Sequence, residues 1–485
     1  MRNKKAILYS VILLLFSTLF KSFLYFQNSR YIFTADEMTY LLNARAIYLG
    51  QIFNGEVLST HYPPLYSFLI SPAFLAGNSI LHNVQLLNAV YSSLSVVLTF
   101  LILRLQLNQK FSFVGALTSA LLPFHLFIPR QAFSENIYVP LLLFTVYMSI
   151  KPSDMSYKRT LLFGLMITAL FLTRYITLVI LPVLILFWLL RNFEGNKYSI
   201  VLRHLIILLS TLFVFYGLWV LYGVLNGVPV GGMLGFHITE NTKPEYLTME
   251  RFIYFSIKVA CYSVLLSGPF LFPVVVYYWN NFPRSIFDRH DTGRFFRLYH
   301  SFSPKTQLLF LFSGITASFW VAITRHYWRA MYNIPNVSKF SSRYFAYLVP
   351  LVFILAWFGV GELKSKKTKL LILYTTAICC LVPSYLLIFN GHFTRVPFIP
   401  QIIRRLTSLD ITLYLGDYRL WYLAGLVLLP VTLLFRRDRH KVIYTTLIVV
   451  HMTILLAVSY QNLGDLTPKP YNLEWQIAEF GEIPP

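Results

Sequence analysis

Long apolar runs recur along this sequence and constrain its fold more than any other feature. Several contain the roughly 20 residues that a helix needs to cross the hydrocarbon core of a bilayer. In lipid, backbone N–H and C=O groups must be satisfied within the chain, which favours helices. We therefore predict an all-α polytopic membrane protein with about thirteen transmembrane helices. The segments lie at 6–26, 86–103, 111–129, 137–150, 160–173, 175–190, 204–225, 256–279, 306–324, 344–360, 370–389, 420–435 and 442–460.

The composition excludes a soluble fold. Of the 485 residues, 56% are hydrophobic and only 12% are charged, about half the usual charged share. So few charges cannot cover a water-exposed surface. The first run is too long for a signal peptide and no small-x-small cleavage site follows it, so we expect an uncleaved anchor.

The charges indicate an orientation. Lysine and arginine number 41 against 19 acids, a net charge of +22. When the apolar segments are threaded alternately, the connections on the amino-terminal side carry most of the basic residues and few of the acids. Short basic loops stay cytoplasmic, which predicts the N-terminus inside and the C-terminus outside. A nucleic-acid surface would instead concentrate the charge in one patch.

The connections on the outer side are long, at 27–85, 226–255, 325–343, 390–419 and 461–485. We expect the chemistry there, because functional residues concentrate on loops held by a rigid scaffold. Cys261, Cys379 and Cys380 all lie in apolar segments, so none is placed for an external disulfide. The stretch from Asp288 to Asp291 on an inner loop is interpreted as a solvated polar turn rather than a metal cluster.

The first outer loop predicts an amphipathic helix along the membrane surface. Thr34 and Glu37 form a capping-box pattern, and Gly50 is a natural helix stop. Asp36 and Glu37 fall in the first turn, where the helix dipole favours ionised carboxylates. Capping alone explains Glu37. Carboxylates at the mouth of a membrane cavity are also what a general base acting on a hydroxyl requires.

The same loop continues from His61 through Tyr62, Pro63 and Pro64. The two prolines predict a rigid, extended turn. This stretch is either a structural corner or, through His61, a substrate contact.

Three further sites place charges near the outer face. Arg130 and Glu135 flank a tight turn, either as interfacial anchors or as part of a site. The runs 160–173 and 175–190 span only about 21–24 Å as helices, against a core of about 30 Å. Arg174 at their junction either lies at depth, where a charge usually marks function, or extends to the interface.

The outer loop 325–343 opens with Arg325, His326, Trp328 and Arg329. Interfacial anchoring explains Trp328 and Arg329 equally well. The loop ends at Arg343, whose guanidinium between aromatic residues suits a lipid-linked phosphate that it would bind bidentately.

At these positions the chain resembles the GT-C superfamily, the polytopic glycosyltransferases that use polyprenyl-phosphate sugars and that include the protein O-mannosyltransferases and the lipid A aminoarabinose transferases. The resemblance spans most of 1–360. It rests on Asp36-Glu37 with Tyr40, Ala44-Arg45, the run from His61 to Tyr66, Ser134 to Asn136, Thr173 to Tyr175, and Arg343-Tyr344 before a proline-containing helix.

The resemblance implies an inverting transfer of a sugar from a polyprenyl-monophosphate carrier to an acceptor hydroxyl on a glycan, lipid or protein, with Asp36 as the base. An adjacent Asp-Glu pair resembles the metal-independent branch, so we expect neither a divalent metal nor another cofactor. The expected site comprises Asp36, Glu37 and Glu135 as catalytic acids, Arg343, Arg174 and Arg130 at the donor phosphate, and Tyr40, His61 and Tyr62 at the substrate.

We expect a GT-C-like transmembrane catalytic domain over 1–460 and a short outer tail over 461–485, in the plasma (inner) membrane with the active site facing the outer or periplasmic side. Two other functions stay open. A lipid-linked sugar flippase or transporter would need charges along a through-pathway, and an O-antigen-ligase-like enzyme would depend on outer arginine and histidine more than on Asp36.

Overall fold

In the computed structural model of the protein, the described residues are 2–26, 35–51, 58–76, 80–122, 125, 128–151, 156–192, 198–234, 248–267, 271–282, 302–330 and 347–362. Every regular element within these ranges is helical, which confirms the all-α class. The apolar segments 370–389, 420–435 and 442–460, the tail 461–485 and the stretch from Asp288 to Asp291 lie outside the described ranges.

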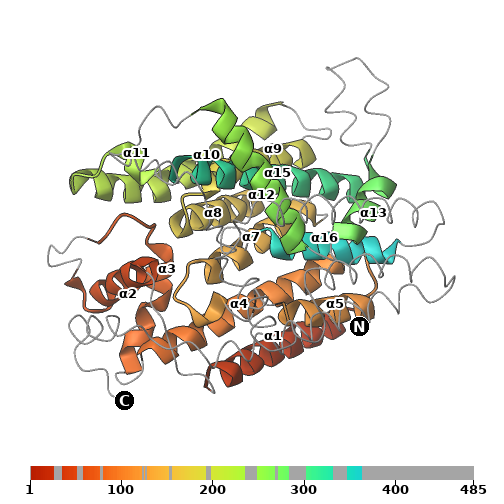
Figure 1. The fold of residues 1–485 in the computed structure, drawn as a ribbon, viewed down its shortest axis with the longest axis horizontal. Coiled ribbons are helices and arrows are strands. Elements are labelled where there is room, and N and C mark those ends of the chain that lie inside the picture. The colour runs from red at the N-terminus through yellow and green to blue at the C-terminus, as the bar shows by residue number, and fades with distance from the viewer. Residues whose placement is uncertain are drawn as a thin grey trace, which may run out of the picture.

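The described helices form a bundle (Figure 1). In chain order they are α1 (Arg2–Phe26), α2 (Ala35–Tyr48), α3 (Leu65–Ile70), η2 (Ser71–Ala76), α4 (Ile80–Leu103), α5 (Gln109–Ala120), η3 (Ile128–Arg130), α7 (Glu135–Ile150), α8 (Tyr157–Thr173), α9 (Thr177–Asn192), α10 (Tyr198–Leu225), α11 (Val230–Met233), α12 (Met249–Ser267), α13 (Leu271–Asn281), α15 (Pro304–Ala330) and α16 (Val349–Gly361).

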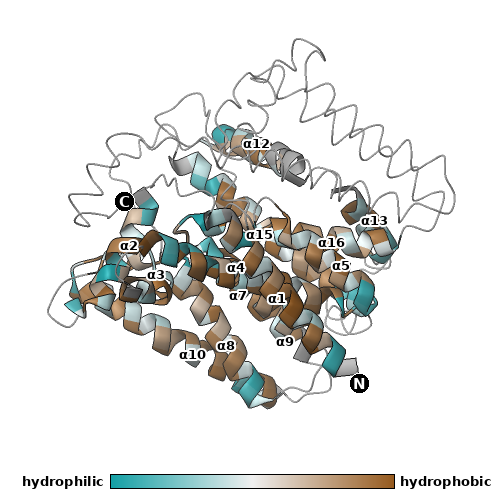
Figure 2. Cartoon of the chain, turned by 90° about the horizontal axis from the view of Figure 1, so that it is seen from below, coloured by the Kyte–Doolittle hydropathy of each residue, from teal (hydrophilic) through white to brown (hydrophobic). Residues whose placement is uncertain are grey.

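Four of these helices, α1, α4, α10 and α15, are long and apolar enough to cross a membrane. The helices carry mainly hydrophobic residues along their lengths (Figure 2). On α10, Phe213, Leu218 and Leu225 are exposed, as they would be on a helix that faces lipid. A helix that is hydrophobic on its exposed side needs an apolar solvent, so these surfaces support a membrane location.

The interior is formed around α4, which packs against α1, α5 and α7, while α7 also contacts α8 and α9. Aromatic side chains fill the spaces between the helices. Phe163 stacks on Trp188 with ring centroids 4.1 Å apart, and Trp357 of α16 donates a hydrogen bond to the Phe111 carbonyl at 3.1 Å. Buried aromatic pairs of this kind stabilise a core beyond the area that they bury.

Prolines shift two of the predicted segments. The run 256–279, predicted as one span, forms two helices, α12 and α13. Pro269 lies in the sequence between them and Pro273 is near the start of α13; proline lacks the N–H that a continuous helix would need. The predicted run 111–129 is likewise wrong in extent. Helix α5 ends at Ala120, shortly before Pro123.

Helix α15 extends further than the sequence predicted. It continues to Ala330, so Arg325, His326 and Trp328 lie in its last turns rather than in an outer loop. The Trp328 indole donates a hydrogen bond to the Thr248 carbonyl at 3.2 Å, next to the start of α12. This contact, together with the packing of α12 on α15, extends the helix beyond the apolar run.

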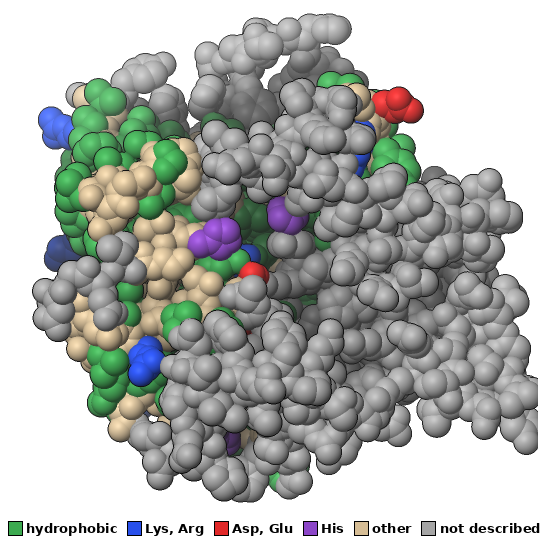
Figure 3. Space-filling model, turned by 60° about the vertical axis from the view of Figure 1, so that its left-hand side comes forward, with side chains coloured by type: hydrophobic (Ala, Val, Ile, Leu, Met, Phe, Trp, Pro, Cys, Tyr) green, Lys and Arg blue, Asp and Glu red, His purple; other side chains and the backbone are tan. Residues whose placement is uncertain are grey.

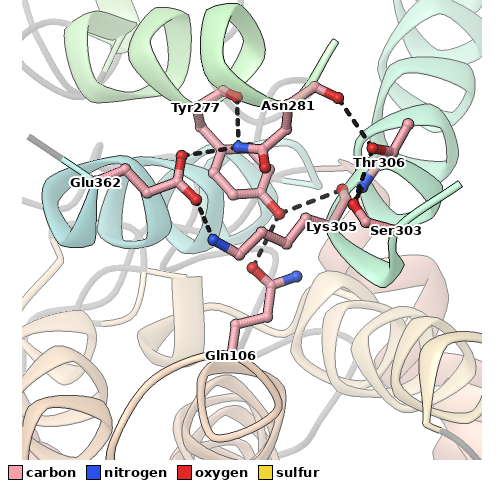
Figure 4. Close-up of polar contacts among 7 residues, drawn as sticks. All are labelled: Gln106, Tyr277, Asn281, Ser303, Lys305, Thr306 and Glu362. Carbon is pink, nitrogen blue, oxygen red and sulfur yellow. Dashed lines mark hydrogen bonds and ion pairs between the residues drawn. The ribbon is translucent and has the colours of Figure 1, made fainter. Parts of the chain in front are cut away.

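Polar side chains fasten the other end of the bundle, where α4, α13 and α16 end and α15 begins (Figure 4). Lys305 pairs with Glu362, and Asn281 donates a hydrogen bond to the same carboxylate at 2.7 Å. The Tyr277 hydroxyl donates to Gln106 Oε1 at 2.9 Å. The network therefore ties the second half of the described bundle to the turn after α4.

Helices α13 and α16 approach most closely at Gly359, which lies against the backbone of Pro273. We expect Gly359→Ala to destabilise the protein, because a methyl group there would overlap the Pro273 carbonyl, and overpacking of this kind costs about 1–3 kcal/mol. Thermal unfolding in detergent would show a lower melting temperature. Gly217→Ala on α10 is the control. Its added methyl meets nothing within 4 Å, so its melting temperature should stay unchanged or rise. Equal behaviour of the two variants would contradict the packing described here.

Candidate functional site at one end of the bundle

The predicted site residues that the structure describes gather at one end of the bundle. Helices α2 and α3 lie at this end, opposite the N-terminus (Figure 1). Helices α1, α5 and α8 end here, and α4, α7 and α9 begin here. Residues far apart in the sequence meet because each hairpin of the bundle returns to the same end.

Helix α2 carries two carboxylates in its first turn, as predicted. Glu37 is fully buried, and its Oε1 accepts a hydrogen bond from the Ala132 backbone N–H at 2.9 Å. Asp36 is only half-buried. Gly50, with φ of 66°, follows the helix as the predicted stop. Thr34, the other half of the capping-box pattern, lies outside the described residues.

The loop between η3 and α7 is shaped by amide side chains. Asn136 Nδ2 donates to the carbonyls of Phe133, Gln131 and Ile128 at 2.9, 3.1 and 3.3 Å. From α4, Asn88 donates to the Gln131 carbonyl at 2.9 Å and Gln85 to that of Arg130 at 3.2 Å. These bonds satisfy carbonyls of a buried loop that has no secondary-structure partner.

The roles of Gln85 and Asn88 were not among the predictions from the sequence. Both lie on α4, an otherwise strongly apolar helix, and both are buried. A buried amide on such a helix needs a partner, and this signal could have identified them.

Tyrosines connect the first outer loop to this structure. The Tyr40 hydroxyl donates to Ser134 Oγ at 2.9 Å, and that of Tyr66 donates to Asn88 Oδ1 at 3.0 Å. Burial, with a smaller contribution from nearby Glu37, raises the pKa of the Tyr66 hydroxyl well above its ordinary value, so it stays a donor. Tyr40 is buried, and its ring lies 4.8 Å from that of Tyr62.

The turn from His61 to Pro64 is present, but it is not extended throughout as predicted. Pro64 has φ of −82° and ψ of −19° and forms the N-cap of α3, because a proline ring sets φ in the helical range. His61 is exposed and Tyr62 half-buried, with their rings 4.5 Å apart. The Tyr175 hydroxyl donates to the Thr60 carbonyl at 2.8 Å and fastens this turn to the junction of α8 and α9.

Two of the predicted site charges form an ion pair. Arg174 follows the end of α8 and lies 2.5 Å from Glu135 Oε1 in the first turn of α7. The Glu135 side chain is 0% exposed and that of Arg174 12%. Arg174 also lies over the ring of Tyr347, 5.5 Å from its centroid. The partner of Arg174 is therefore Glu135, which the sequence placed on the same turn as Arg130.

Arg130 lies in η3 and is 5% exposed. It interacts electrostatically with Tyr25 near the end of α1. Figure 3 shows histidine, acidic and basic side chains beside a hollow on this face of the molecule. Arg343 and Tyr344 lie outside the described residues. Among the described residues, no group of three His, Cys, Asp or Glu could hold a metal ion, and metal-independent chemistry stays a prediction.

No protein-family model matches the sequence, and no curated protein matches it. Several solved structures are, however, similar to this chain in fold. ArnT from Cupriavidus metallidurans in the apo state aligns with a TM-score of 0.50 at 13% identity, over 96% of this chain and 78% of ArnT. The same protein bound to undecaprenyl phosphate gives 0.50 and 14%, over 94% and 77%.

The archaeal oligosaccharyltransferase AglB from Archaeoglobus fulgidus, in complex with an inhibitory peptide and a dolichol-phosphate, aligns less well. Its TM-score is 0.48 at 11% identity, over 98% of this chain and 60% of AglB. ArnT, a lipid A aminoarabinose transferase, belongs to the GT-C superfamily. Its likeness shows that the chain has the GT-C fold, which confirms at the level of the fold the resemblance expected from the sequence.

Asn136 gives a direct test of how the loop is held. We expect Asn136→Asp, which has almost the same shape, to lower the melting temperature and increase proteolysis within 128–134. The new carboxylate oxygen would face three carbonyl oxygens, and each lost buried bond costs about 1–3 kcal/mol. Asn226→Asp, at an exposed asparagine that donates to a single carbonyl, is the control and should change neither measurement. If the Asn136 variant were as stable and as protease-resistant as the control, the amide would not hold the loop.

Proposed function

We propose that this chain is an integral-membrane inverting glycosyltransferase that moves a sugar from a polyprenyl-monophosphate carrier to an acceptor hydroxyl. The observation that carries the proposal is the meeting of Asp36, Glu37, Glu135 and Arg174 at one end of a GT-C-type bundle. The ArnT structure bound to undecaprenyl phosphate supports a carrier of this class.

The leaving group in such a transfer is a phosphate anion, which needs positive charge and no general acid. Arg343 and Arg174 would hold this phosphate, with Arg130 nearby. A guanidinium suits the role because it can bind two phosphate oxygens at once. No divalent metal or other cofactor is part of this proposal.

Asp36 would act as the base toward the acceptor hydroxyl. Of the three acids it is the one that is not fully buried, since Glu37 and Glu135 are 0% exposed. Attack on the anomeric carbon from the face opposite the phosphate would invert its configuration in one step. His61 and Tyr62 lie on the same turn and would contact the sugar or the acceptor, while buried Tyr40 would act on the site through Ser134.

The remaining topology is also proposed: about thirteen spans, a catalytic domain over 1–460 and an outer tail over 461–485. The N-terminus of α1 lies at the end of the bundle opposite α2 (Figure 1). An N-terminus inside, as the basic inner loops indicate, would direct the site toward the outer or periplasmic side of the plasma membrane.

Transport without chemistry and glycan ligation from a diphosphate carrier are the alternatives. The described site charges gather at one end instead of following a path through the bundle, which favours transfer over transport. Asp36, Glu37 and Glu135 lie in the first turns of α2 and α7, which supports a base-assisted transfer to a hydroxyl.

Asp36→Asn tests the proposed base. We expect transfer of label from a polyprenyl-monophosphate sugar to fall by about 10²–10⁴-fold, the usual contribution of general-base catalysis, while undecaprenyl-phosphate binding is retained. Glu250→Gln, which changes an acid in the first turn of α12, should transfer at the normal rate. Near-normal turnover in the Asp36 variant would exclude it as the base.

Arg343→Ala tests the proposed phosphate contact. We expect a weaker affinity for undecaprenyl phosphate, by about tenfold or more, because hydrogen bonds between charged groups contribute roughly 1.5–3 kcal/mol. Binding titrations in detergent would measure it. Arg104→Ala is the control, since Arg104 lies over Phe100 just after α4, at the other end of the bundle. A change in the amount of folded protein alone, with affinity intact, would assign Arg343 to membrane anchoring.

A further inference from the structure

We propose that Glu135 and the donor phosphate compete for Arg174, so that binding of the donor releases Glu135. This inference rests on the proposed function and deepens it. In the structure, Arg174 pairs with Glu135. When a phosphate takes the guanidinium, the carboxylate would become available to the reacting sugar and acceptor.

The burial of the two partners gives the order of events. The Glu135 side chain is 0% exposed, whereas Arg174, 2.5 Å away, is 12% exposed. An anion that enters the site would therefore meet the guanidinium before the carboxylate. In the proposed exchange, Glu135 would act on a substrate only after the pair separates.

Tyr347 gives the guanidinium a second, independent support. Arg174 lies over this ring, 5.5 Å from its centroid, a cation–π contact that does not depend on which anion the guanidinium binds. The ring is fixed between Tyr138 and Phe319, with centroids 4.9 and 5.1 Å away. Arg174 could thus exchange one anion for another without losing its position.

A small void beside Glu135 gives the released carboxylate space to move. Glu135 lines this void together with Ser92, Ser95, His125 and Asn136. The Ser95 hydroxyl is 1% exposed and makes no hydrogen bond within the described part of the chain. A buried hydroxyl without a partner is rare. It supplies a donor for Glu135 at the moment when the carboxylate loses Arg174.

The chemistry of the two anions sets the direction of the exchange. In the sugar donor the phosphate is a diester with one negative charge and two free oxygens, and it binds guanidinium bidentately, as a carboxylate does. When the sugar leaves, the carrier becomes a monoester with three free oxygens and more negative charge, so it competes better than Glu135 for Arg174. A buried carboxylate left without a partner is costly. The Arg174–Glu135 ion pair would therefore weaken donor binding. It would also release the Glu135 carboxylate only when donor is bound.

The experiment measures affinity for undecaprenyl phosphate with the full chain in nanodiscs. We expect Glu135→Gln to bind this lipid at least threefold more tightly than the wild type, because the competing carboxylate is removed, and to transfer sugar more slowly. Glu362→Gln is the matched control. It removes the carboxylate of the Lys305 pair at the other end of the bundle and should leave lipid affinity unchanged.

A folded Glu135→Gln variant with equal or weaker lipid affinity would overturn the exchange. Ser95→Ala keeps the inference testable if Glu135→Gln fails to fold. It should weaken lipid affinity because the released carboxylate loses its new donor, and an unchanged affinity would count against the exchange. A wild type that does not bind undecaprenyl phosphate would overturn the proposed function as well, whereas binding without the Glu135 effect would overturn only the exchange.

Discussion

The hydrocarbon of a bilayer offers no hydrogen bonds to a backbone, so each chain segment that crosses it must satisfy its own N–H and C=O groups. The bundle follows from this constraint. The irregular backbone and the charged side chains of the candidate site lie at helix ends, and successive helices bring those ends together. Helix α2, the loop after η3 and the junction of α8 and α9 therefore meet at one end, although more than 120 residues separate α2 from the junction in the sequence.

At that end, two of the three acids are part of the architecture. Glu37 accepts the Ala132 N–H and joins α2 to the loop that leads into α7. Glu135 holds Arg174 and joins α7 to the end of α8. Asp36 is next to Glu37 in the same helical turn, and it is only half-buried. These contacts of Glu37 and Glu135 therefore fix the position of Asp36 without involving its own carboxylate. Under the proposed function, this arrangement would hold Asp36 in place as a base within reach of a substrate.

The sequence predicted the helices well because hydropathy reports the solvent directly. The ends of the helices were predicted less accurately. One predicted span corresponds to two helices, α12 and α13, and contacts with α12 extend α15 beyond its apolar run. The sequence also predicted both acids of α2 and the position of Arg174, from a capping pattern and two short helices. It could not predict that Glu135 is the partner of Arg174, because that pairing depends on how α7 packs on α8. The roles of Gln85 and Asn88 depend in the same way on tertiary contacts with a loop.

The central claim is that the end of the bundle around Asp36 performs transfer from a lipid monophosphate. The most direct measurement uses the purified protein in vesicles with a polyprenyl-monophosphate sugar labelled in the sugar and a mixture of cell-envelope acceptors. The account predicts that the label leaves the lipid carrier and that one polyprenyl phosphate forms for each sugar transferred. Label that crosses the bilayer while still attached to its carrier would contradict it and identify a transporter.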